Sequence, residues 1–264
     1  MGPRPPQILA FGGGGFSMEG GNTMLDDHVL ELTGVSRPRV CFLPTASGDA
    51  DHYIVRFYRA LAPSRCEPSH ISLFRRETGV EDPRSHLLEQ DLIYVGGGSV
   101  VSLLGTWCAH GLDSALREAW QAGVVLCGGS AGSLCWFHEA VSGFHGGAPR
   151  RVRGLGLLPW SNAVHYDDEP PRRAAFQSAI AGGMTAGYAA SDGAALHFVG
   201  TELAEVIASQ PGARAYFVSA DGEGRATERE LPVRFLGAGG APGLDSEAGV
   251  KGVRHASDSR AVAA

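Results

Sequence analysis

The chain has 264 residues, 44% of them hydrophobic, which is enough for one large α/β domain or two small ones. Its net charge of -6 and its pI near 5.9 argue against a nucleic-acid-binding surface, which needs a basic stripe. No stretch has the roughly 20 apolar residues that a membrane span requires, and residues 1–6 lack the apolar core of a secretory signal. We therefore expect a cytoplasmic protein with no nucleic-acid or membrane partner.

Short apolar runs alternate with helical stretches over the first half of the chain. The helical stretches include residues 51–61 and 112–122. This alternation predicts a parallel sheet with helices on both faces. The predicted strands are residues 7–11, 39–43, 70–74, 92–95 and 123–127.

Four of these strands run directly into turns of glycine and other small residues. The turns are residues 12–15, 44–48, 96–99 and 128–130. In an open α/β sheet, ligands bind beyond the carboxyl ends of the strands. The four turns therefore predict one crevice at that edge of the sheet.

The later part of the chain is richer in β-type sequence. Residues 200–208 and 213–219 are predicted strands that could pair as a hairpin. From Leu236 onward the sequence is first glycine-rich and then polar. We expect a single domain over residues 1–236 and a flexible tail over residues 237–264.

The turn at residues 128–132, Gly-Gly-Ser-Ala-Gly, fits the G-x-S-x-G pattern of a nucleophile elbow. A buried strand precedes it and a predicted helix at residues 133–137 follows it. Such a sharp turn exposes the serine Oγ and leaves room only for very small neighbours. We predict that Ser130 is a nucleophile, with a helix N-cap as the alternative role.

An oxyanion hole for this serine needs backbone N–H donors. The N–H of Ala131 is one candidate, and Gly97 or Gly98 at the neighbouring strand end is the other. The alternative is a phosphate-binding loop. No G-x-G-x-x-G lies at this strand end and no Walker lysine follows it, which favours the oxyanion role.

A serine nucleophile needs a general base, which is usually histidine near neutral pH. His165 lies after Ser130 in the chain, on a loop that leaves room for one crossover and return. The other histidines are less suitable: we expect surface positions for His28, His52 and His86, and a satisfied core position for His197.

The third member of a triad is a carboxylate that orients the imidazole. Glu139 is the first choice because it is the only acid between Ser130 and His165. Asp167 and Asp168 are the alternatives, although they lie close after the histidine for this geometry.

Together these motifs resemble the peptidase E family (peptidase family S51), serine dipeptidases that also include cyanophycinases. The resemblance covers about residues 7–220. It is carried by residues 95–99, 128–132, 155–159, 165–167 and 192–196.

The resemblance implies an α/β/α sandwich similar to class I glutamine amidotransferases. Ser130 would be the nucleophile and His165 the base, and Ala131 with Gly97 or Gly98 would form the oxyanion hole. The implied activity is removal of an N-terminal residue from dipeptides, with aspartate preferred in the best-known branch. The resemblance implies no metal or organic cofactor, and it makes a homodimer a reasonable expectation.

The sequence departs from the family where the best-known members carry an aspartate in a loop after the serine. Residues 140–145 contain no acid here. We therefore expect a Ser-His-Glu triad with Glu139, and we expect Asp192 to bind the substrate α-amine or to cap a turn. An arginine would recognise an aspartyl substrate, and the candidates are Arg150, Arg151, Arg153, Arg172 and Arg173.

Three other functions fit parts of this pattern. The first is a cyanophycinase-like or isoaspartyl-cleaving hydrolase with the same machinery. The second is an esterase of the α/β-hydrolase type, for which His255 in the tail is a poor base. The third is a non-catalytic ligand-binding relative of the amidotransferase fold.

Overall fold

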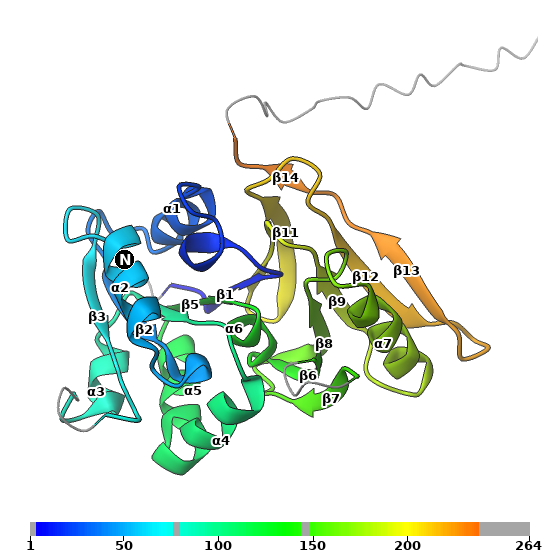
Figure 1. Cartoon of the computed structure of the whole chain (residues 1–264), viewed down its shortest axis with the longest axis horizontal. Helices are drawn as coiled ribbons and strands as arrows, with labels where there is room; N and C mark the ends of the chain where they lie inside the picture. Colours follow the sequence, from blue (N-terminus) through cyan, green and yellow to red (C-terminus); the bar gives the residue numbers. More distant parts are fainter. Residues whose placement is uncertain (1–3, 76–79, 144–147, 238–264) are drawn as a thin grey trace, which may run out of the picture.

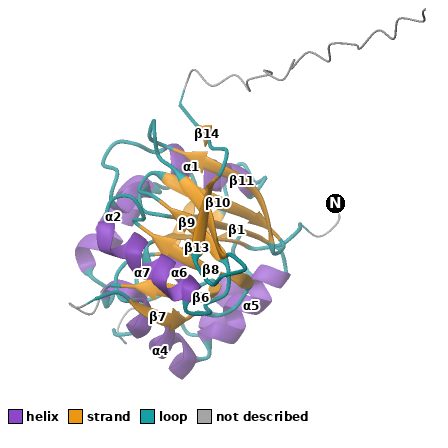
Figure 2. Cartoon of the chain, turned by 90° about the vertical axis from the view of Figure 1, so that its right-hand side faces the viewer, coloured by secondary structure: helices purple, strands orange, loops and turns teal. Residues whose placement is uncertain are grey.

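The computed structural model describes residues 4–75, 80–143 and 148–237. Their strands form two sheets (Figure 1). Figure 2 shows strands of both sheets in the interior of the molecule, with helices around them.

The first sheet has eight strands in the order β14-β11-β10-β1-β5-β4-β2-β3. The five strands from β1 to β3 in this order are parallel, and β10 joins β1 antiparallel. The strands are β1 (Gln7–Phe11), β2 (Arg39–Leu43), β3 (Glu67–His70), β4 (Leu92–Val95), β5 (Val125–Gly129), β10 (Ala194–Val199), β11 (Glu202–Ala208) and β14 (Arg234–Phe235).

Helices cover both faces of this sheet because its central strands are apolar on both sides. Leu9 and Phe11 of β1 face α1 and α2, while Ile8 and Ala10 face the side of α4 and α5. The helices are α1 (Met24–Leu32), α2 (Asp51–Ala60), α3 (Pro83–Leu88), α4 (Val100–His110), α5 (Leu112–Gln121), α6 (Ala131–Leu134) and α7 (Pro170–Ala181), with 3-10 turns at η1 (Gly15–Ser17) and η2 (Thr45–Ser47).

The second sheet has six strands in the order β13-β12-β9-β8-β6-β7. It packs against the β10 side of the first sheet, where Phe198 meets Phe137 edge to face at 5.7 Å between ring centroids. Helix α7 covers its other face through Phe176 and Ile180. The strands are β6 (Phe137–Ser142), β7 (Arg150–Arg153), β8 (Leu158–Val164), β9 (Gly187–Ala190), β12 (Ala215–Ala220) and β13 (Ala226–Glu230).

These layers confirm the predicted α/β/α sandwich around a mostly parallel sheet, but three local predictions are wrong. The third strand is residues 67–70 instead of 70–74, on the half-buried edge of the sheet. The helix after Ser130 is a single turn, and the chain then enters β6. Strands β11 and β12 do not form a hairpin, because they belong to different sheets.

Part of the predicted tail, residues 238–264, lies outside the described residues. Within the described part of the chain, no helix combines the length and the apolar character needed to cross a lipid bilayer.

Candidate active site

Ser130 lies on a strained turn between β5 and α6. Its φ of 55° and ψ of -117° lie in a region that non-glycine residues rarely occupy. The glycines on either side are required by close packing: a Cβ on Gly128 would lie 2.6 Å from the carbonyl oxygen of Val95, and one on Gly132 would collide with the same oxygen. The turn is thus packed against the end of β4, and this packing holds Ser130 in its strained conformation at the strand end.

His165 follows β8 of the second sheet and reaches across to this serine. Its Nε2 lies 3.0 Å from Ser130 Oγ. The residue has a φ of 53°, and its backbone N–H donates to the carbonyl of Gly12 at 3.1 Å. The end of β1 therefore fixes the backbone that directs the imidazole at Ser130.

Asp192 completes a line of hydrogen bonds. Asp192 lies in the turn between β9 and β10, and its Oδ1 lies 2.5 Å from His165 Nδ1. The carboxylate is partly shielded, with 26% of the side chain exposed. The backbone N–H of Asp192 donates to the Asp168 carboxylate at 2.7 Å, which anchors the turn.

Gly13 makes room for this arrangement. A Cβ at this position would collide with the Asp192 carboxylate and would lie 2.9 Å from His165 Cε1. The Gly13 carbonyl accepts the N–H of Gly193 at 2.9 Å, so β1 is bonded to the turn that carries Asp192. The glycine run after β1 thus serves close packing around the histidine and the aspartate.

The expected placement of Glu139 at His165 is wrong. Glu139 lies on β6, where its carboxylate binds Arg151 at 2.7 Å and the N–H of Thr185 at 3.2 Å. Partial burial opposes ionisation, but these hydrogen bonds lower the pKa of Glu139. The prediction fails because the chain enters strand β6 shortly after Leu134. Glu139 therefore lies within the second sheet, away from His165.

The alternative acids and the expected role of Asp192 also need correction. The Asp167 carboxylate binds Arg173 and Tyr216, and that of Asp168 binds the backbone of Asp192, so neither takes the triad position. Asp192 contacts His165 instead of lying free for a substrate amine. The sequence does contain one signal: Asp192 begins an Asp-Gly turn one residue after the strand at residues 187–190, downstream of both Ser130 and His165.

The predicted oxyanion residues lie beside the serine. A Cβ on Gly97 would lie 3.3 Å from Ser130 Cβ, and Ala131 is the residue directly after Ser130. The Gly97 N–H makes one long hydrogen bond of 3.3 Å to the Tyr53 hydroxyl. Gly98 has a φ of 137°, and a side chain there would collide with the carbonyl of Ala46. The strand end therefore leaves bare backbone next to Ser130.

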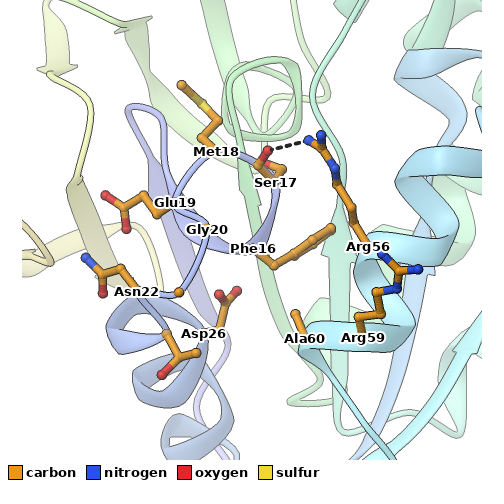
Figure 3. Close-up of a pocket in the computed structure, with 12 residues that line it drawn as sticks. Phe16, Ser17, Met18, Glu19, Gly20, Asn22, Asp26, Arg56, Arg59 and Ala60 are labelled. Atoms are coloured by element: carbon orange, nitrogen blue, oxygen red, sulfur yellow. Dashed lines mark hydrogen bonds between the residues drawn. The ribbon is translucent and has the colours of Figure 1, made fainter.

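A separate hollow lies between the loop after β1 and helix α2 (Figure 3). Arg56 of α2 donates to the carbonyl of Ser17 at 3.2 Å across it. The carboxylate of Asp26, on α1, is fully buried, and neither oxygen has a hydrogen-bond partner among the described residues. Burial raises the pKa of Asp26 to about 7, although Tyr94 and Arg65 lower it in part.

A serine, a histidine and an aspartate in one hydrogen-bonded line at the strand ends of an α/β sheet form the arrangement that serine hydrolases use. The sequence model of peptidase family S51 matches residues 8–206. The chain belongs to this family.

Several individual proteins are similar to it. An uncharacterized peptidase, YgaJ of Bacillus subtilis (strain 168), is 47% identical over 232 residues, which are 88% of this chain and 99% of the relative. Peptidase E of Streptomyces coelicolor is 31% identical over 55% of this chain and 59% of its own length.

Solved structures share the fold at low sequence identity. A peptidase from an acI-B1 Actinobacterium superposes with a TM-score of 0.65 at 18% identity, over 88% of this chain and 96% of that one. A putative peptidase E from Listeria monocytogenes EGD-e gives a TM-score of 0.52 at 16% identity, over 86% of this chain and all of that one. These likenesses support the fold assignment.

Proposed function

We propose that this chain is a serine-type peptidase that hydrolyses short peptides through Ser130, His165 and Asp192. The observation that carries the proposal is the line of two hydrogen bonds, 2.5 Å from Asp192 to His165 and 3.0 Å from His165 to Ser130. This Ser-His-Asp set replaces the Ser-His-Glu set expected from the sequence.

The geometry supports acyl transfer. His165 Nε2 takes the proton of Ser130 as Oγ attacks the peptide carbonyl, and a tetrahedral intermediate forms. Asp192 accepts from Nδ1–H, which keeps the Nε2 lone pair toward the serine and stabilises the imidazolium. His165 then donates its proton to the leaving amine, and water hydrolyses the acyl-enzyme with His165 again acting as base.

The developing oxyanion would rest on backbone N–H groups. Ala131 and either Gly97 or Gly98 are the proposed donors, because they flank Ser130 at two adjacent strand ends. The Gly97 N–H would exchange its long bond to Tyr53 for the shorter bond to an oxyanion.

Removal of the N-terminal residue from dipeptides is the proposed specificity, supported by the relatives that are named peptidase E. A preference for N-terminal aspartate has less support. Of the expected arginines, Arg151 is paired with Glu139, Arg172 with Glu169, and Arg173 with Asp167 and Glu228. Those guanidinium groups are already occupied by carboxylates of the chain itself.

A dipeptide-library screen of the purified protein tests the proposal, with Asp-X dipeptides and a β-linked aspartyl polymer among the substrates. We expect cleavage of some dipeptides by the wild type and a loss of several orders of magnitude in kcat for Ser130→Ala, because triad members act as a unit. A fluorophosphonate probe should label the wild type at Ser130.

Unchanged cleavage by Ser130→Ala would overturn the proposal. Cleavage of the polymer without cleavage of dipeptides would shift the assignment to a cyanophycinase-like enzyme. Failure of the probe to label a folded wild-type protein that cleaves no peptide would favour a non-catalytic relative.

A further inference from the structure

Two histidines and a glutamate meet between helix α1 and the first sheet, in a part of the molecule that the proposed mechanism does not use. They are His28 of α1, His197 of β10 and Glu205 of β11. One ligand atom from each residue lies within 4.8 Å of the other two. The expected surface position of His28 is wrong, because its side chain is only 13% exposed. His197 lies in the core as expected, but its Nδ1 has no hydrogen-bond partner among the described residues.

The nitrogens that face this cluster have no hydrogen bond. His28 Nε2 and His197 Nδ1 are buried and lack a partner among the described residues. His197 as a whole is only 6% exposed. A buried polar atom without a partner costs free energy, and each such atom in a folded protein calls for an explanation.

Both nitrogens point toward the same carboxylate oxygen. Glu205 Oε1 lies 3.6 Å from His197 Nδ1 and 3.9 Å from His28 Nε2, too far for hydrogen bonds. Ligand atoms on one tetrahedral zinc ion, each about 2.1 Å from it, lie about 3.4 Å apart. The two nitrogen–oxygen separations are somewhat longer than this value, and all three ligand atoms lie within 4.8 Å of one another, so the side chains would have to draw together to bind one ion.

The tautomer of His197 suits a metal ligand. Its Nε2 lies 3.0 Å from Gln7 Oε1, which can only accept, so Nε2 carries the proton. The lone pair therefore lies on Nδ1, the atom that faces His28 and Glu205. Outer-shell hydrogen bonds of this kind commonly orient metal-binding histidines.

Glu205 is also held in position from behind. Arg234 donates from Nε at 2.9 Å and from Nη2 at 2.8 Å to Oε2 of Glu205. This leaves Oε1 directed at the two histidines. Glu31 is the other acid near His28, with its Oε2 3.9 Å from Nδ1, and it is largely exposed.

Burial lowers the pKa of both His28 and His197, although the Glu205 carboxylate opposes the shift in each case. A neutral imidazole is the form that binds a metal ion.

We propose that His28 Nε2, His197 Nδ1 and Glu205 Oε1 bind a divalent transition-metal ion of the zinc class. Two imidazoles and one carboxylate favour such ions over calcium or magnesium, which prefer all-oxygen sites. Because Arg234 offsets the negative charge of Glu205, the two histidine nitrogens supply most of the preference for a transition-metal ion. The ion would join α1 to the strands β10 and β11, and it would stabilise the fold without entering the peptidase reaction.

The test is metal binding by untagged, chelator-treated protein, measured by calorimetry with Zn²⁺ and by visible absorption with Co²⁺. We expect one equivalent of either ion in the wild type and an upward shift of the melting temperature with zinc. His28→Ala and Glu205→Gln should each weaken metal binding at least tenfold. Gln7→Leu removes the acceptor that keeps the His197 proton on Nε2, and it should weaken binding about 10- to 100-fold.

His110→Ala is the matched control, because His110 is an exposed histidine at the end of α4. It should bind metal as the wild type does. His28 takes no part in the proposed mechanism, so His28→Ala should keep the peptidase activity. Its side chain is only 13% exposed, so the melting transition of the metal-free variant is measured to verify that it is folded. The absence of stoichiometric binding by the wild type would overturn the proposal, as would equal binding by His28→Ala.

Discussion

The carboxylate that supports His165 is the feature on which the structure and the sequence-based expectation differ, and Asp192→Asn tests it directly. Asparagine has nearly the same shape, so the turn between β9 and β10 should remain intact. Its amide NH₂ would donate to His165 Nδ1, the atom that now lies 2.5 Å from Oδ1. The ring would then carry its proton on Nε2, where it cannot accept the proton of Ser130.

The expected loss follows from this tautomer change. Loss of the correctly oriented base costs about 10⁴-fold in kcat in serine proteases, or about 5.5 kcal/mol of transition-state stabilisation. Glu139→Gln is the matched comparison, because it also replaces a carboxylate by an amide. It removes the charge from the ion pair with Arg151, whose side chain is 45% exposed, while the amide oxygen can still accept the hydrogen bond from the Thr185 N–H. It should therefore change stability by about 1 kcal/mol and leave kcat unchanged.

The assay is kcat and KM on the best dipeptide for wild type, Asp192→Asn and Glu139→Gln, with circular dichroism to verify folding. Most of the loss in Asp192→Asn should appear in kcat, because the substrate-binding surface is unaltered. Near-wild-type kcat in Asp192→Asn together with an inactive Glu139→Gln would refute the argument and restore the Ser-His-Glu set.

Two further predictions concern close packing and a buried charge. Gly13→Ala should fold yet lose about 100-fold or more in kcat/KM, because the new methyl group displaces Asp192 and His165 and small misplacements are costly; wild-type kcat/KM in this variant would refute the packing argument. Asp26→Asn should stabilise the protein at alkaline pH. The pKa of Asp26 is raised from 3.8 to about 7, so the folded state holds a proton that the unfolded chain releases, and stability falls as pH rises between these values. Urea unfolding should show equal stability of wild type and Asp26→Asn near pH 3.5, and a free energy of unfolding up to roughly 4 kcal/mol higher for the variant above pH 8. Equal unfolding midpoints at pH 8 would show that ionised Asp26 does not destabilise the folded state.

The local sequence was sufficient to predict the sharp turn that carries Ser130 and the strands around it. The elbow depends on contacts within a few residues and on the neighbouring strand end, and its glycines are visible as a motif. Strands β1, β2, β4 and β5 are buried on both faces, so each appears as a continuous apolar run. Such runs need no knowledge of distant pairing.

The carboxylate that contacts His165, that of Asp192, could not be identified in the same way. Its position depends on β8 and β9 pairing in parallel in the second sheet, and on the turn after β9 reaching Gly13 in the first. Both are pairings between segments far apart in the chain. Glu139 was favoured on chain order alone, but the single-turn helix α6 sends it into β6 and away from His165.

The bond between Gly13 and the Asp192 turn has a consequence for when the protein becomes active during its synthesis. The turn that carries Ser130 is synthesised well before residue 192 leaves the ribosome, but His165 and Asp192 take their positions only after β9 has paired with β8 and β10 has paired with β1. Such long-range pairings form late because loop closure must precede them. A partly made chain therefore carries Ser130 without His165 beside it, and the proposed catalytic line is complete only once the last third of the domain has folded onto the earlier strands.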